Sequence, residues 1–141
     1  MENRREFLRV HTERACKLKI SISGSTEMQE IPARMVDIST GGCKLLTEQS
    51  LGEVKVLYLD IIFDEKREAE IRESNVFLQV DMDKALQNLT KTLVIKLIRE
   101  SEENNLYAYN TQFINLSADL EREVFSYVNR RNMLIRRSKQ H

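Results

Sequence analysis

The chain has 141 residues, which is enough for one domain with a hydrophobic core of its own. Hydrophobic residues make up 41% of the sequence and charged residues 31%, a composition that is typical of globular proteins and excludes intrinsic disorder. The 22 Lys and Arg residues balance the 22 Asp and Glu residues, so the total charge predicts no general affinity for nucleic acid or membranes.

The charge is unevenly distributed along the chain. Residues 1–19 carry six basic and three acidic side chains, and residues 122–141 carry six basic and one acidic. The remaining residues, 20–121, hold ten basic and eighteen acidic side chains. Two cationic ends therefore flank an acidic central part.

The sequence has no feature of a membrane or secreted protein. Its longest apolar stretch, residues 56–63, is interrupted by Asp60 and is too short to cross a membrane. Charged residues begin at Glu2, so we expect no signal peptide and a cytoplasmic location. Cys16 and Cys43 are too few for a disulfide scaffold and lack zinc-binding spacing, so we expect two free, buried thiols and no metal.

The first half of the chain has the alternation of apolar and polar residues that is typical of half-buried strands. This pattern covers residues 15–22, 31–39, 43–48 and 54–63. Short polar segments that contain glycine separate the strands. Pro32, near the start of the second strand, indicates an edge or strand-entry position.

The central part, residues 65–90, has weaker patterns. Residues 67–80 fit either a strand or a short helix, whereas residues 81–89 have the apolar spacing of a helix. Asp81 and Asp83 resemble the start of a calcium-binding loop, but the glycine and the later glutamate of such a loop are missing. We therefore expect a solvated helix start there.

The last third predicts two further strands and one long helix. Residues 92–98 are rich in β-branched side chains and residues 106–114 alternate, with a polar turn at residues 101–105 between them. Ser117 is placed to cap a helix over residues 117–137. Acidic residues follow it in the first turn, where they interact favourably with the positive end of the helix dipole.

That helix has one apolar stripe and a cationic end. Leu134 and Ile135 belong to the stripe, and two arrangements stay open for them: packing back on the chain's own barrel, or pairing with a second subunit. The arginines of the last turns are expected to form a solvated cationic face; they are Arg130, Arg131, Arg136 and Arg137.

These elements together predict a mainly β fold. Six or seven strands in series imply an antiparallel sheet, and closure into a small barrel is the simplest way to remove its edges. The expected architecture is a six- to seven-stranded antiparallel β-barrel with a long C-terminal α-helix. Since no repeat or linker is visible, we expect a single domain over residues 1–141.

Two short motifs carry the functional information. The first, RREFLR at residues 4–9, contains Arg5 and Arg9, the only Arg-x-x-x-Arg pair in the chain. The second, DISTGG at residues 37–42, has the form Asp-x-Ser-x-x-Gly. Each motif alone is weak evidence, because arginines are common and Asp and Ser are ordinary residues before a glycine turn.

Together, in this order and spacing, the motifs resemble those of the PilZ domain, the bacterial receptor module for cyclic di-GMP (c-di-GMP). The segment MVDISTGGCKL (35–45) is similar to the family's strand, turn and strand, and FINLSADLEREVFSYVNRRN (113–132) is similar to its last strand and capped helix. Residues 65–90 have no counterpart in this resemblance, and we expect an insertion there. Larger members carry a partner domain before the arginine motif, so a single-domain member is expected.

The resemblance also implies the domain's layout. We expect a flexible arginine arm at residues 1–12, the barrel within residues 13–116, and the C-terminal helix over residues 117–137.

The resemblance assigns c-di-GMP binding to Arg5 and Arg9, with Arg4 as a helper. Guanidinium groups suit this ligand because they bind phosphate and the guanine O6 and N7 edge through paired hydrogen bonds, and stack on rings. Asp37 can accept a hydrogen from guanine N1 or N2, or hold an arginine in its binding rotamer. Ser39 supplies a short hydroxyl, although Asp37 and Ser39 can also simply close the turn.

Glycine roles and one departure from the family complete the predicted site. Gly42, with Gly41 in a shared role, permits a backbone geometry or a ligand approach that a Cβ would obstruct. The family usually has a glycine shortly before the residue equivalent to Phe113, where this chain has residues 109–112. Asn110 tolerates a left-handed conformation and is expected to preserve the bulge at that place.

The expected function is a c-di-GMP receptor or adaptor without enzymatic activity and without a cofactor. It orders its arginine arm on ligand binding and signals to a protein partner in motility, pilus, polysaccharide-synthesis or transcription machinery. The alternative is a PilZ-like protein-interaction module without nucleotide binding. A barrel that binds single-stranded nucleic acid is disfavoured by the acidic centre and by an aromatic content of 6%. No catalytic constellation is readable around His11 or His141.

Overall fold

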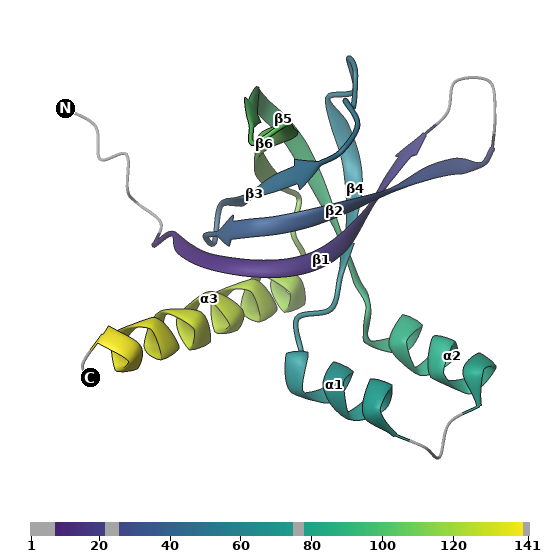
Figure 1. Cartoon of the computed structure of the whole chain (residues 1–141), viewed down its shortest axis with the longest axis vertical. Helices are drawn as coiled ribbons and strands as arrows, with labels where there is room; N and C mark the ends of the chain where they lie inside the picture. The colour runs from purple at the N-terminus through teal and green to yellow at the C-terminus, as the bar shows by residue number, and fades with distance from the viewer. Residues whose placement is uncertain (1–7, 22–25, 75–77, 140–141) are drawn as a thin grey trace.

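A computed structural model describes residues 8–21, 26–74 and 78–139. Within them, six antiparallel strands close into a barrel in the order β1-β2-β3-β6-β5-β4. The strands are β1 (Val10–Ser21), β2 (Met28–Ile38), β3 (Gly42–Thr47), β4 (Val56–Ile61), β5 (Lys91–Glu103) and β6 (Leu106–Ile114). Each predicted strand has a counterpart, and the predicted barrel with a C-terminal helix is confirmed (Figure 1).

The barrel surrounds the hydrophobic core. Hydrophobic residues of all six strands point inward and are nearly inaccessible to solvent, because every second residue of a strand points to the same face. The largest of them are Leu18, Met35, Ile38, Leu45, Leu59, Leu93, Ile95 and Tyr109. The core therefore fixes which side of each strand faces outward, where a ligand can reach it.

Two boundaries differ from the predicted ones. β1 begins at Val10, which is buried and pairs with Ile38 of β2, so residues 10–12 belong to the barrel and not to the predicted arm. β5 continues to Glu103, and the chain reverses at Asn104 and Asn105, whose φ angles are 51° and 68°. Asparagine tolerates this left-handed conformation, which a two-residue hairpin turn requires.

Two helices occupy the interval between β4 and β5: α1 (Glu65–Glu73) and α2 (Gln79–Leu89). Where the structure describes the region left open between strand and helix, residues 67–73 and 79–80 are helical, and the helix predicted over residues 81–89 is confirmed. Figure 1 shows both helices beyond the end of β4 and the start of β5, on the opposite side of the view from the start of β1.

An ion-pair cluster ties α1 to the barrel. Arg14 of β1 is almost buried, and its guanidinium group contacts Glu68 at 2.7 Å and Glu65 at 3.3 Å. A buried arginine is stable only when carboxylates compensate its charge, so these contacts fix the position of α1.

The C-terminal helix, α3 (Ala118–Lys139), packs along β1. Ser117 caps it as predicted, since the Ser117 Oγ accepts a hydrogen bond of 3.2 Å from the Leu120 N–H. A buried hydrogen bond of 2.6 Å joins the hydroxyl groups of Tyr127 and Thr12. α3 is thereby held against the first strand.

The apolar stripe of α3 has two outcomes. Ile135 packs against the chain's own core, which is one of the two arrangements left open by the sequence. Leu134 is exposed. Subunit pairing through Leu134 stays a prediction. No helix among the described residues has both the length and the apolar character needed to cross a membrane.

Candidate ligand-binding site

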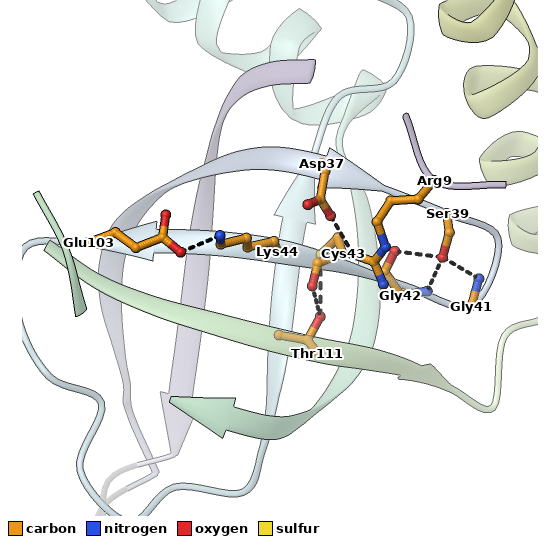
Figure 2. Close-up of polar contacts among 9 residues, drawn as sticks. All are labelled: Arg9, Asp37, Ser39, Gly41, Gly42, Cys43, Lys44, Glu103 and Thr111. Carbon is orange, nitrogen blue, oxygen red and sulfur yellow. Dashed lines mark hydrogen bonds and ion pairs between the residues drawn. The ribbon is translucent and has the colours of Figure 1, made fainter. Parts of the chain in front are cut away.

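The turn between β2 and β3 is closed by Ser39 (Figure 2). The Ser39 hydroxyl accepts hydrogen bonds of 3.2 Å from the Gly41 and Gly42 N–H groups and donates one of 3.3 Å to the Gly42 carbonyl. The Ser39 N–H donates to the same carbonyl at 2.8 Å. Because Ser39 is 3% exposed and its hydroxyl is used within the turn, the turn-closing role expected as an alternative describes this residue.

Gly42 allows β3 and β6 to approach closely. A Cβ on Gly42 would lie 2.0 Å from the Thr111 carbonyl oxygen, a distance that no packed side chain tolerates. The neighbouring Gly41 carbonyl accepts a 2.9 Å hydrogen bond from the Phe113 N–H. Of the two roles expected for Gly42, the geometry supports close backbone approach.

A β-bulge turns Asp37 outward. Met35 and Ile38 are both fully buried although they are three residues apart, whereas regular alternation buries residues two apart. The register of β2 against β3 shifts between Met35 and Asp37, where Val36 is the extra residue. Without this bulge, Asp37 would share the inward face with Met35; with it, the carboxylate lies on the outer surface.

The two sequence motifs meet in an ion pair between Arg9 and Asp37. The Arg9 Nη1 donates to the Asp37 Oδ1 at 2.6 Å, across 28 residues of sequence. Arg9 directly precedes β1, in which His11 is the register partner of Asp37. The Arg9 side chain is 54% exposed and that of Asp37 is 23% exposed, so both groups are accessible. Asp37 thus holds an arginine, one of its two expected roles.

The other predicted arginines, Arg4 and Arg5, lie outside the described residues. The structure therefore brings together Arg9, Asp37 and the turn from Ser39 to Gly42, on one end of the β2–β3 pair (Figure 2).

Lys44 of β3 was missed by the sequence reasoning. It is the register partner of Asp37 and lies between two inward residues, Cys43 and Leu45, so its side chain is on the same outer face. Its Nζ forms an ion pair with a carboxylate oxygen of Glu103, at the end of β5 (Figure 2). Alternation predicts that Lys44 faces outward, but its position beside Asp37 depends on the bulge.

A row of polar residues crosses the outer face of the barrel through this point. Successive register partners on β1, β2, β3, β6 and β5 form it: His11, Asp37, Lys44, Asn110 and Arg99. Cross-strand partners point to the same face of a sheet, so these side chains form one continuous polar strip.

The bulge expected at Asn110 is not formed by that residue, which does not adopt the left-handed conformation. The described non-glycine residues with positive φ are Asn104, Asn105 and Asn115. The irregularity lies across the ladder, in β5, where the register shifts between Leu97 and Arg99. A bulge is therefore present at this edge of the strip, but on the neighbouring strand.

The cationic end of α3 reaches the same region. The Arg131 Nε donates to the His11 carbonyl at 3.3 Å, and the Arg130 guanidinium carbon lies 5.9 Å from the centre of the Tyr127 ring. Arg131 therefore bonds to β1, which corrects the prediction of a purely solvated face at that residue. The Arg130 contact lies within α3, and Arg130, Arg136 and Arg137 are exposed as predicted.

The thiols offer no reactive group. Both cysteines are free as predicted; Cys43 is buried, whereas Cys16 is only half-buried. Burial raises the pKa of each thiol to about 12, so both stay protonated near neutral pH. The Cys43 Sγ lies 3.3 Å from the Thr111 Oγ1. Among the described residues, no group of three or more His, Cys, Asp or Glu side chains is arranged to hold a metal ion.

Comparison with known proteins gives a family and a fold. A family model of the PilZ domain matches residues 3–130. Among solved structures, the chain is similar to the PilZ domain with c-di-GMP of YcgR from Escherichia coli, with a TM-score of 0.63 and 16% identity over 98% of each chain. A search of the curated proteins found no match.

Two larger proteins share the fold. The Bacillus subtilis inhibitor of motility (MotI/DgrA) matches with a TM-score of 0.62 and 15% identity, over 94% of this chain and 53% of its own. The K. pneumonia MrkH–c-di-GMP complex matches with a TM-score of 0.60 and 14% identity, over 100% of this chain and 56% of its own. The chain thus spans about half of each.

Proposed function

The chain belongs to the PilZ domain family, and we propose on this premise that it is a c-di-GMP receptor that signals to a protein partner. The observation that carries the proposal is the 2.6 Å contact between Arg9 and Asp37, which joins the family's two motifs on an accessible face. The structures of YcgR and MrkH that share its fold are described as c-di-GMP complexes, which supports the same ligand here.

The chemistry of the site fits the ligand. A cyclic dinucleotide offers two phosphates, two guanine edges and two base faces, and guanidinium groups bind all three. We assign these contacts to Arg5 and Arg9, with Arg4 as a helper. Asp37 orients Arg9 and accepts hydrogen bonds from a guanine edge. Ser39, Gly41 and Gly42 provide the rigid turn against which the nucleotide lies; their contribution is the shape of the wall.

Signalling follows from holding the N-terminal segment on the ligand. Arg9 is bound to the barrel through Asp37, so a nucleotide that binds Arg9 and Arg5 together fixes the preceding residues against the same face. A protein partner can then read a surface that has lost exposed positive charge. We propose a cytoplasmic adaptor of this kind with no catalytic role, acting on motility, pilus, polysaccharide-synthesis or transcription machinery.

Calorimetric titration of the full chain with c-di-GMP tests the proposal. We expect the wild type to bind, and Arg5→Ala or Arg9→Ala to weaken binding about 10- to 100-fold, equivalent to about 1–3 kcal/mol. Arg67→Ala is a matched control, because Arg67 on α1 is 53% exposed and is likewise paired with a carboxylate, that of Glu70. Its affinity should equal that of the wild type.

The alternative function predicts a different titration. A PilZ-like interaction module without nucleotide binding gives no heat with the wild-type protein at any ligand concentration. Binding that is unchanged in both Arg5→Ala and Arg9→Ala would reject the site assignment while leaving the receptor function in place.

A further inference from the structure

We propose that Lys44 is a second anion-binding position of the receptor face, which takes a phosphate group of the ligand, and that Glu103 competes for it from within the chain. This inference rests on the proposed function, because the ligand is the same nucleotide. Nothing in the two sequence motifs includes Lys44 or Glu103, and the proposal depends on the register and contacts of the barrel.

The position of Lys44 places a cation beside the motif residues. Lys44 and Asp37 are register partners, and the side chains of such partners begin about 5 Å apart on the same face. Arg9, which directly precedes β1, contacts Asp37 from the other side of β2. A ligand bound by Arg9 and Asp37 therefore lies beside the base of the Lys44 side chain. Figure 2 shows this side chain extended away from Asp37 and toward Glu103, so it has to leave Glu103 to reach the ligand.

The chemistry of lysine selects phosphate over the base. An ammonium group is a compact point charge without the planar fork that matches a guanine edge, so its favourable partner on a cyclic dinucleotide is a phosphate oxygen. The ligand has two phosphates, and the arginine motif does not need to bind both. Lys44 would take the phosphate nearer to β3.

Glu103 gives this cation an exchangeable partner. The Lys44 side chain is 24% exposed, so its charge has lost part of its hydration, and the Glu103 carboxylate compensates for this loss. The Glu103 side chain is 43% exposed and sits next to the hairpin turn at Asn104, so it can return to water at little cost. A phosphate can therefore replace the carboxylate at Lys44.

Competition by Glu103 and a merely structural ion pair predict different changes in ligand affinity when either partner is removed. If the pair only ties β3 to the end of β5, removing either partner lowers stability and neither change improves ligand binding. If Glu103 competes with phosphate, Glu103→Gln releases Lys44 and tightens binding, whereas Lys44→Met removes the cation and weakens it. Opposite effects of the two variants are the signature of the proposal.

The experiment is a c-di-GMP titration of the full-length variants, with thermal melts to confirm folding. We expect Lys44→Met to bind about tenfold more weakly and Glu103→Gln about threefold more tightly than the wild type. Glu30→Gln is the matched control, because Glu30 is an exposed carboxylate paired with Lys17 at 3.3 Å and away from the strip. It should bind within twofold of the wild type, which separates local competition from a change in net charge.

The possible results distinguish a failure of the Lys44 assignment from a failure of the receptor function. Wild-type binding with equal affinity in Lys44→Met, or weaker binding in Glu103→Gln, overturns the inference about Lys44 and leaves the receptor function standing. Equal tightening in Glu30→Gln and Glu103→Gln overturns it too, since a general charge effect then explains both. A wild type that does not bind overturns the receptor function and this inference together.

Discussion

The β2–β3 turn and the polar strip on the outer face of the barrel lie next to each other but differ in how their polar groups are used. In the turn, the Ser39 hydroxyl makes three hydrogen bonds within four residues and is shielded from solvent. In the strip, Asp37 and Lys44 form partly exposed ion pairs. The Arg9–Asp37 pair joins the segment before β1 to β2, and the Lys44–Glu103 pair joins β3 to β5.

This difference indicates that some residues of the Asp-x-Ser-x-x-Gly motif stabilise the fold and others are available to bind a ligand. A buried, satisfied hydroxyl is costly to redirect to a ligand, because its donors and acceptors would be left unpaired. An exposed ion pair contributes about 0–1 kcal/mol to folding and can exchange partners. We therefore expect the motif's Ser and Gly to build the wall of the site, and its Asp, with Arg9, to contact the ligand. The predictions below test this separation through the free energy of unfolding, from the largest change to the smallest.

Gly42→Ala should cause the largest loss of stability. The new Cβ would collide with the backbone carbonyl of Thr111, so β3 and β6 must separate, at a cost of about 3 kcal/mol. Gly52→Ala is the control, because Gly52 has open space around its Cβ position but a φ of 67°, which costs only about 1 kcal/mol. Urea unfolding measures both. Equal losses at the two glycines would mean that contact with β6 does not set the role of Gly42.

Ser39→Ala should lower the unfolding free energy by about 1–2 kcal/mol, because the Gly41 and Gly42 N–H groups lose their acceptor. We expect the folded protein to bind c-di-GMP within about threefold of the wild type. Ser126→Ala, at an exposed position of α3, should leave stability unchanged. A tenfold loss of affinity in Ser39→Ala without loss of stability would make Ser39 a direct ligand contact.

Asp37→Asn should show the reverse pattern. Its exposed ion pair contributes little to folding, so the unfolding free energy should change by less than about 1 kcal/mol. Affinity for c-di-GMP should fall about tenfold, because the amide no longer holds the Arg9 guanidinium group or accepts two hydrogens from guanine. Paired unfolding and titration measurements check this. A large loss of stability with unchanged affinity would mean that Asp37 stabilises the fold and does not bind the ligand.

Much of the fold followed from local patterns, because alternation and turn residues report which strand face is buried. The exceptions have non-local causes. α1 is charged on nearly every side and buries only Ile71, so its periodicity was weak, and its position depends on the contacts of Arg14 with Glu65 and Glu68.

The site divides in the same way. The resemblance brought Arg9 and Asp37 together in advance, and the structure joins them. Lys44 could not be placed beside Asp37, because a one-residue bulge at Val36 sets that register and has no distinct local signal. The role of Ser39 stayed open because the sequence does not show whether a hydroxyl in a turn forms hydrogen bonds with a ligand or with the backbone.

Backbone chemical-shift mapping of the full chain during a c-di-GMP titration tests the central claim most directly. We predict that the largest shift changes occur at Arg9, His11, Asp37 and Lys44. The contrary result is an unperturbed strip, with changes confined to the cleft of about 500 Å³ that Lys19, Asp60 and Arg72 line between β1 and the α1–α2 pair, or with no changes at all.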